Sequence, residues 1–309
     1  MRSDTVKRIA KECGFELAGV AMAAPAEDFA RYQRWMERGF AGEMRYLTDR
    51  RAELRRDPRS VLASARSVIC MGKLYNTTLD NTGPANDPPV SRYAWGSRDY
   101  HDVLREGLQR IVERLLAIEP FEYKICVDTA PLLERSYARL AGLGWIGKNT
   151  CLIHEPLGSW FFLGEILTSL DLEPDSAPPD RCGSCTRCIE ACPTQALVRE
   201  GEGWTLDSRR CISYLTIELR GPIPEDLRAG IGEHVFGCDI CQEVCPWNSR
   251  APVSDEPAFA PREIPPPEEL AQMTEGHFRE FARGTPLARP KYAGFQRNAR
   301  QALENKGRR

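Results

Sequence analysis

Long apolar runs are missing from this 309-residue chain. The most apolar window, residues 158–170, is interrupted by Glu165 and is too short to cross a bilayer. The N-terminus carries charges throughout and shows neither a signal-peptide pattern nor a twin-arginine leader. We therefore expect a cytoplasmic globular protein without membrane attachment, and we expect it to be a monomer.

Histidine is scarce, and the usual nucleotide-binding motifs are absent. None of the four histidines pairs with another at metal-ligand spacing, so each is expected to be an ordinary surface or core residue. There is no P-loop, and Asp99-Tyr100-His101 begins like a cobalamin-ligand run but lacks its glycine. The GLGWIG segment at 142–147 has dinucleotide spacing, but it follows an expected helix rather than a strand, which argues against that use.

Cysteine, in contrast, is abundant: the chain has twelve. Two runs, each ending in Cys-Pro, lie at 182–193 and 238–246, with Cys211 between them. The first run has the spacing of bacterial ferredoxins, in which the fourth cysteine ligates the other cluster. The second run has only three cysteines, and Cys211 is the one available to complete the set. We therefore predict two 4Fe-4S clusters, the first held by Cys182, Cys185, Cys188 and Cys245, and the second by Cys192, Cys211, Cys238 and Cys241.

A structural zinc site and a disulfide framework are the two other uses of these cysteines. Structural zinc sites usually take two near-symmetric ligand pairs, which the triple run and the Cys-Pro steps fit poorly. Disulfides require an oxidising compartment, for which the chain offers no sign. The other four cysteines, Cys13, Cys70, Cys126 and Cys151, are expected to be single thiols in a reducing cytoplasm.

The order of the elements predicts a layered α+β or α/β sandwich, followed by a compact ferredoxin-like region. Before the proline-rich boundary at 173–181 we expect strands and helices to alternate. The expected strands are 17–22, 68–71 and 123–127, with apolar runs at 151–154 and 160–167, and the expected helices are 3–13, 27–38, 100–118 and 131–140. A turn-rich loop at 76–90 is of the kind that shapes a site entrance. We predict domains at 1–174 (catalytic), 175–250 (two clusters) and 251–309 (proline-rich linker and basic helical tail).

Charge is nearly balanced overall, with a formal net charge of −2, but it is unevenly distributed. Basic residues gather at 50–59 and at 279–309. Such segments are usually solvated faces, and they also suit a polyanionic partner.

Asp128 is the candidate catalytic residue. It follows the apolar strand expected at 123–127, at a place where α/β folds often put their sites. In a pocket with little water, its carboxyl group could donate a proton. The alternative is that Asp128, with Thr129, caps the following helix, and the sequence does not separate the two roles.

Four segments closely resemble the epoxyqueuosine reductase family, and the resemblance extends from about residue 5 to about residue 250. They are Val127–Arg135, Ala141–Thr150, Cys211–Thr216 and Gly237–Pro246, and the displaced Cys211 is part of the same pattern. The resemblance implies an oxidoreductase that removes the epoxide oxygen of epoxyqueuosine at the wobble position of tRNA, the last step of queuosine synthesis. It further implies cobalamin, two 4Fe-4S clusters, an external electron donor and a corrin-binding domain similar to that of reductive dehalogenases.

The resemblance also assigns residue roles. It implies that Asp128 is the proton donor and lies beside the cobalamin. The other implied cobalamin contacts are Arg51, Leu152, Leu163, Ser213, Asp239 and Ile240. Residues 251–309 resemble only the start of the HEAT-like repeats found in longer family members.

Two other functions remain open at this point. A corrinoid dehalogenase of a small halogenated molecule is one, although such enzymes typically carry an export leader. A non-catalytic ferredoxin-type electron carrier is the other. Bound corrin would exclude the carrier, and activity on tRNA would exclude the dehalogenase.

Overall fold

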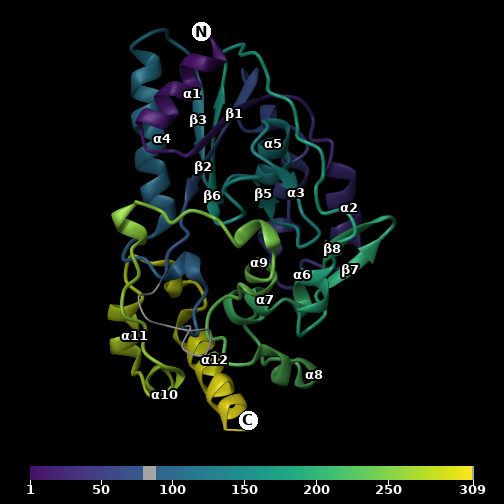
Figure 1. The fold of residues 1–309 in the computed structure, drawn as a ribbon, viewed down its shortest axis with the longest axis vertical. Helices are drawn as coiled ribbons and strands as arrows, with labels where there is room; N and C mark the ends of the chain where they lie inside the picture. The colour runs from purple at the N-terminus through teal and green to yellow at the C-terminus, as the bar shows by residue number, and fades with distance from the viewer. Residues whose placement is uncertain (79–87, 308–309) are drawn as a thin grey trace.

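A computed structural model describes residues 1–78 and 88–307. Residues 79–87 of the loop predicted at 76–90 lie outside the described residues. Figure 1 shows a sheet region at the N-terminal end of the molecule, a region of short helices that carries the cysteines, and a set of C-terminal helices at the opposite end.

A four-stranded sheet forms the centre of the first region, with strand order β1-β2-β6-β3 and antiparallel pairing throughout. The strands are β1 (Leu17–Met22), β2 (Ser67–Leu74), β3 (Tyr123–Cys126) and β6 (Phe161–Thr168). Every residue of β2 is buried, and so are all residues of β6 except Leu163. Such continuous burial is typical of central strands covered on both faces.

Helices cover both faces of this sheet (Figure 1). α1 (Ser3–Glu12) and α4 (Tyr100–Leu116) pack on one face, and α5 (Glu134–Leu140) packs on the other. Side chains of β2 alternate between the two cores, Ile69 facing α4 and Cys70 facing α5, as the pleat of a strand requires. The predicted sandwich is confirmed, and its antiparallel pairing makes it an α+β fold.

Two short helices and a small hairpin complete the α5 side of the sheet region. They are α2 (Phe29–Glu37), α3 (Arg51–Leu54), β4 (Trp145–Ile146) and β5 (Leu152–Ile153). Phe29 and Leu152 join the same core as α5.

The helix predicted at 131–140 begins three residues later, at Glu134, and this part of the prediction was wrong. Asp128 has a φ of 54°, and the Thr129 N–H bonds back to the Val127 carbonyl, so the chain makes a tight turn directly after β3. It recovers a helical path only after Leu133, whose ψ of 71° is not helical.

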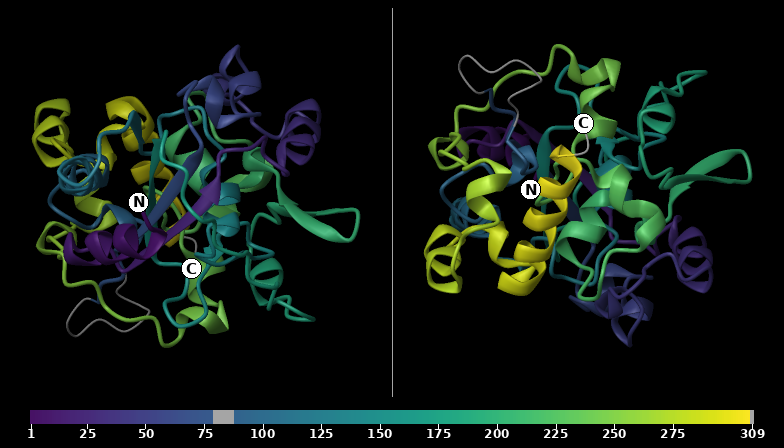
Figure 2. Two further views of the ribbon diagram at one scale, coloured as in Figure 1. Left: turned by 90° about the horizontal axis from the view of Figure 1, so that it is seen from above. Right: turned by 90° about the horizontal axis from the view of Figure 1, so that it is seen from below.

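The cysteine-rich region is built from short elements around small apolar clusters. Its helices are α6 (Arg187–Glu190), α7 (Ile212–Ile217), α8 (Glu225–Arg228) and α9 (Ile240–Glu243), and its hairpin is β7 (Leu197–Glu200) with β8 (Gly203–Leu206), which projects from the body in Figure 2. So small a core gains much of its stability from what its cysteines bind.

The C-terminal helices pack against this region. They are α10 (Pro267–Leu270), α11 (Glu275–Phe281) and α12 (Lys291–Lys306). Their apolar side chains surround Trp95 and Phe236. The buried Asn298 amide donates to the carbonyls of Thr216 (2.7 Å) and Val235 (2.9 Å). The helical tail expected from the sequence is therefore anchored to the cysteine-rich region by both packing and hydrogen bonds.

Within the ranges described, no helix combines the length and the apolar character needed to cross a bilayer.

Candidate functional site

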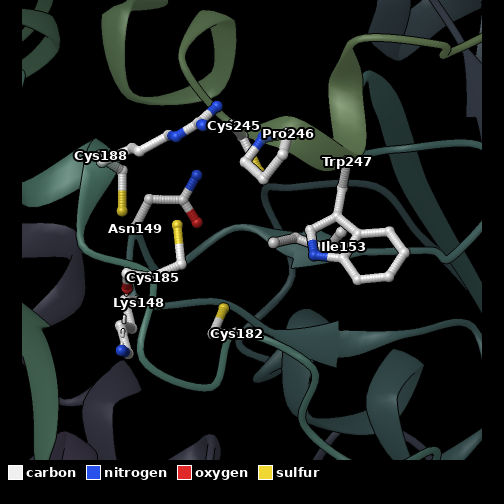
Figure 3. Close-up of a pocket in the computed structure, with 10 residues that line it drawn as sticks. Lys148, Asn149, Ile153, Cys182, Cys185, Cys188, Cys245, Pro246 and Trp247 are labelled. Carbon is white, nitrogen blue, oxygen red and sulfur yellow. Dashed lines mark hydrogen bonds between the residues drawn. The ribbon is translucent and has the colours of Figure 1, made fainter.

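Four cysteines from two separate loops line one pocket. Figure 3 shows the sulfur atoms of Cys182, Cys185, Cys188 and Cys245 around a common space, with Trp247 at its side. Lys148 fixes the first loop, since its Nζ donates to the carbonyls of Gly183 (2.6 Å) and Cys185 (2.9 Å). The fold thus brings together the four residues predicted to hold the first cluster, and it places a cation beside them.

The other four cysteines form a second group. Burial raises the pKa of the Cys238 thiol, and Cys211 and Cys192 raise it further by their proximity. The proximity of Cys238 and Cys211 likewise raises the pKa of the Cys241 thiol. These couplings join residues that come from three different segments of the chain. They are the four residues predicted to hold the second cluster.

The arrangement of the thiols bears on the two other uses considered for them. All twelve cysteines are free, so no disulfide is formed. Among residues 1–78 and 88–307, no three Cys, His, Asp or Glu side chains converge on the position of a single ion. A zinc ion would need four ligands within about 2.3 Å of one point, whereas a cubane offers a separate iron to each thiolate. The ligand assignment of the cysteines stays a prediction.

Cys151 was expected to be an isolated thiol, and the structure places it against Cys241. The two thiols are hydrogen-bonded, which lowers the pKa of Cys151 and raises that of Cys241. The proximity of Cys151 also raises the pKa of Cys245 in the first group. A fifth thiol thus lies close to members of both groups.

Asp128 lies at the end of β3 with its side chain 62% exposed. It does not cap α5, which begins at Glu134 behind Leu133 and has no side-chain cap, so the capping alternative is wrong. Its carboxylate is open to solvent, whereas the sequence predicts a pocket with little water. A non-glycine residue at a φ of 54° is a strained conformation of the kind that concentrates at functional sites.

His101 was expected to be an ordinary residue, and it is the hydrogen-bond partner of Asp128. Its Nε2 lies 3.3 Å from Asp128 Oδ2, and its Nδ1 lies 2.6 Å from Asp99 Oδ1. Burial lowers the pKa of His101, but the bonds to Asp128 and Asp99 outweigh it and raise the pKa to about 9. His101 is therefore an imidazolium at neutral pH.

We expect the imidazole of His101 to titrate near pH 9 rather than near the ordinary 6.5. Because its pKa is raised by folding, the stability it contributes is fully present below about pH 6.5 and is lost as the pH rises through about 9. Histidine-selective NMR titration measures this directly, and Asp99→Asn should move the midpoint down towards 6.5. A midpoint near 6.5 in the unmodified protein would contradict the assignment.

Three tyrosines lie within electrostatic reach of the Asp128 carboxylate. Tyr100 stacks on Phe162 with ring centroids 4.2 Å apart, and Tyr93 meets Tyr100 edge-on. Burial, followed by the charge of Glu218, raises the pKa of Tyr46 to about 12. The charge of Asp128 reaches Tyr46, Tyr93 and Tyr100, so neutral phenol groups face it.

Two further carboxyl groups, those of Glu134 and Glu165, lie behind Asp128, and neither residue was predicted to have a functional role. Glu134 Oε1 accepts the Asp128 backbone N–H at 2.6 Å. Burial and then the Asp128 charge raise the pKa of Glu134 to about 8. Glu165 of β6 is completely buried next to Glu134. The sequence feature that could have indicated Glu165 is its position as a single acidic residue inside the apolar window 158–170.

The predicted cobalamin contacts fall into three places. Leu152 and Leu163 lie on the α5 side of the sheet, where Leu163 is partly uncovered on an otherwise buried strand. Arg51 begins α3 and forms a two-pronged ion pair with Asp49, at 3.0 and 2.7 Å. This pairing lowers the pKa of Asp49 to about 2.

The remaining predicted contacts lie in the cysteine-rich region. Ser213 follows Cys211 in the first turn of α7, and Ile240 begins α9. The buried carboxylate of Asp239 accepts the Ser91 hydroxyl (2.5 Å) and the Arg92 N–H (2.6 Å). Asp239 therefore joins the two regions with its side chain, while its carbonyl accepts the N–H groups of Gln242 and Glu243 in the first turn of α9.

Much of the charge in the two basic segments is paired with nearby carboxylates. Arg51, Arg56 and Arg59 each bind an acidic side chain no more than three residues away. Arg289 binds Glu218, and Lys306 binds Glu268. The attraction of these segments for a polyanion is therefore weaker than their composition suggests.

Comparison with known families gives two matches within the chain. Residues 181–248 match the 4Fe-4S double cluster binding domain. Residues 55–129 match the family model described as epoxyqueuosine reductase QueG, DUF1730.

Relatives match over nearly the whole length. The epoxyqueuosine reductase of Xanthomonas campestris pv. campestris is 41% identical over 97% of this chain and 86% of its own. That of Gloeobacter violaceus is 44% identical over 98% of this chain and 96% of its own.

Solved structures of the same kind superpose closely. An epoxyqueuosine reductase crystallised with an epoxyqueuosine-modified tRNA-Tyr stem loop has a TM-score of 0.86 at 30% identity, over 98% of this chain and 80% of that one. The Bacillus subtilis enzyme, solved with its catalytic aspartate loop swung out of the active site, has a TM-score of 0.87 at 30% identity, over 98% and 81%. This chain belongs to the epoxyqueuosine reductase family.

Proposed function

We propose that this protein reduces epoxyqueuosine to queuosine in tRNA, with two 4Fe-4S clusters and cobalamin as cofactors and Asp128 as proton donor. The observation that carries the proposal is the hydrogen bond between Asp128 and a charged His101, in a chain of this family. A carboxyl group bonded to an imidazolium is a site for proton delivery.

The cysteine groups fit two iron-sulfur clusters. Each group offers four thiols and no histidine or carboxylate, the donor set that such clusters require. The first group would comprise Cys182, Cys185, Cys188 and Cys245, and the second Cys192, Cys211, Cys238 and Cys241. Lys148 would partly compensate the negative charge of the first cluster.

The α5 side of the sheet fits the apolar face of a corrin. Leu163 is partly uncovered there, as are Leu133, Ile146 and Leu157 around the same core. We propose that Leu152 and Leu163 would contact the ring, and that Ser213, Asp239 and Ile240 would hold it from the cysteine-rich region. Arg51 would contribute only if it shares its guanidinium with Asp49. When bound, cobalamin and the clusters supply the two electrons.

The protein's own residues supply the proton chemistry. Epoxide plus two electrons and two protons gives alkene and water, and the oxygen would otherwise leave as a costly alkoxide. In the resting protein the transferable proton is on His101 Nε2. We propose that it passes to Asp128 Oδ2 and then to the departing oxygen, and that the second proton comes from solvent, to which the Asp128 carboxylate is open. Asp128 is the residue we match to the aspartate of the loop that swings out in the Bacillus subtilis enzyme.

The proposed substrate is the anticodon stem loop, with the modified base turned out towards Asp128, as is usual when proteins act on single bases of RNA. Tyr46, Tyr93 and Tyr100 offer neutral aromatic groups near that position. We further propose a cytoplasmic location, because the cluster cysteines need a reducing compartment, and an external electron donor.

The test is anaerobic reconstitution with iron, sulfide and cobalamin, followed by incubation with reductant and tRNA that contains epoxyqueuosine. Mass analysis of the digested nucleosides should show epoxyqueuosine converted to the species that lacks one oxygen atom. A halogenated phenol offered in place of tRNA should remain unchanged. Loss of halide with no change in the tRNA would overturn the proposal.

A further inference from the structure

The conformation of Asp128 depends on a contact made by its backbone. An aspartate with φ near 54° is disfavoured unless the surroundings hold it there. Among the described residues, its N–H donates to Glu134 Oε1, at 2.6 Å. Because Glu134 is the first residue of α5, the helix fixes the position of the Glu134 side chain. Glu134 therefore holds the Asp128 backbone, from which the carboxyl group reaches His101.

Glu134 is in turn supported by Glu165. The Glu165 side chain rises from the middle of β6 and is completely buried. Neither of its carboxyl oxygens has a hydrogen-bond partner among the described residues, although the group lies next to Glu134. Two ionised carboxylates are both acceptors only and repel each other. A contact between them therefore requires a proton.

Cations do little to offset the charge of this pair. Among residues 1–78 and 88–307, no ion pair to Glu134 or Glu165 is found, and the groups that face them from β2 and β3 are the thiols of Cys70 and Cys126. Arg135 is a weak influence on Glu134, because its guanidinium donates to the Thr150 carbonyl. Asp128 adds negative charge, and Tyr100 of α4 is neutral. Burial and these charges raise the pKa of both carboxyl groups.

We propose that Glu134 and Glu165 share a proton, and that this carboxyl pair is the positioning element for Asp128. Glu165 carries the proton and donates it to one oxygen of Glu134, while the other oxygen of Glu134 accepts the Asp128 N–H. The pair acts through Asp128 and does not touch the substrate. Its role in catalysis rests on the proposed function, but its existence does not.

The shared proton predicts different outcomes for similar substitutions. In Glu165→Gln the amide N–H replaces the carboxyl proton, so Glu134 and Asp128 should stay in place. In Glu165→Leu the donor is lost while an apolar side chain fills the space. In Glu134→Ala the acceptor for the Asp128 N–H is lost. Glu113→Gln, an exposed position on α4, serves as the matched control.

The first readout needs neither substrate nor turnover. We expect the purified chain at neutral pH to show the infrared carbonyl stretch of a protonated carboxyl group, to lose it in Glu165→Gln and to keep it in Glu113→Gln. The amide resonance of Asp128 should be shifted downfield, remain so in Glu165→Gln and move in Glu134→Ala and Glu165→Leu. A protein without that infrared band, or an Asp128 resonance that is indifferent to Glu134→Ala, overturns the carboxyl pair.

The second readout is turnover by the reconstituted enzyme. Glu134→Ala and Glu165→Leu should lower kcat about a hundredfold at little change in KM for tRNA, as expected for a misplaced catalytic group, and Glu165→Gln should restore most of it. Equal rates in all variants overturn the positioning role even if the infrared band is present. An unmodified enzyme that leaves epoxyqueuosine untouched overturns the proposed function and with it the catalytic role, whereas the infrared and amide results still decide whether the pair exists.

Discussion

Asp128→Asn is expected to abolish product formation while leaving cofactor loading intact. The amide cannot deliver a proton to the departing oxygen, and loss of a general acid typically costs about 10²–10⁴-fold in rate. Asparagine tolerates the left-handed backbone region as aspartate does, so the turn after β3 should keep its φ near 54°. Nucleoside mass analysis gives the rate, and metal and corrinoid analysis gives the loading.

The substitution has a matched control in Asp4→Asn, which changes an exposed carboxyl group on α1. The control should keep full activity and the same melting temperature. Asp128→Ala is a poorer choice, because alanine in a left-handed conformation adds strain of its own. Normal turnover by Asp128→Asn would end the role of Asp128 as proton donor, and helix capping does not remain as an explanation.

Cys211→Ala is expected to lose about half of the bound iron. Cys211 precedes α7 and lies within electrostatic reach of Cys192 and Cys238 in the second group. Removal of one of four thiolates should release or degrade that cluster and leave the first intact, because the first group draws on other residues. Iron and sulfide analysis, with electron paramagnetic resonance after reduction, measures how much of each cluster remains.

Cys13→Ala is the control for this variant. Cys13 is a partly buried thiol at the end of α1, far in sequence from both runs, and its loss should leave the iron content unchanged. Full iron content in Cys211→Ala would refute the ligand assignment. In that case Cys151, which touches Cys241, would be the first candidate for the fourth ligand.

Local patterns were sufficient for most of the individual elements. α1, β1 and α4 begin where their apolar periodicity predicts, and each ends within two residues of its predicted end. The start of α5 was misplaced because a turn at Asp128, stabilised by a side chain six residues further on, delays the helix. The fold brings the cysteines of each predicted set near one another, and the ligand assignment stays a prediction.

The surroundings of Asp128 could not be predicted in the same way. His101 lies 27 positions before it, on α4, and meets it only because α4 packs on the sheet next to the end of β3. Glu165 reaches Glu134 because β6 is inserted between β2 and β3, an order that sequence neighbours do not reveal. Each of these contacts depends on the arrangement of the strands rather than on local propensity.

The sequence by itself determined the chemistry available to this protein: two sets of thiols at cluster spacing, an acidic residue after a strand, and a family resemblance that extends through most of the chain. Only the tertiary structure decided which groups act on that acid. The protonation of His101, Glu134 and Glu165 is set by burial and by charges that come from other elements, and burial exists only once the sheet and its helices have packed.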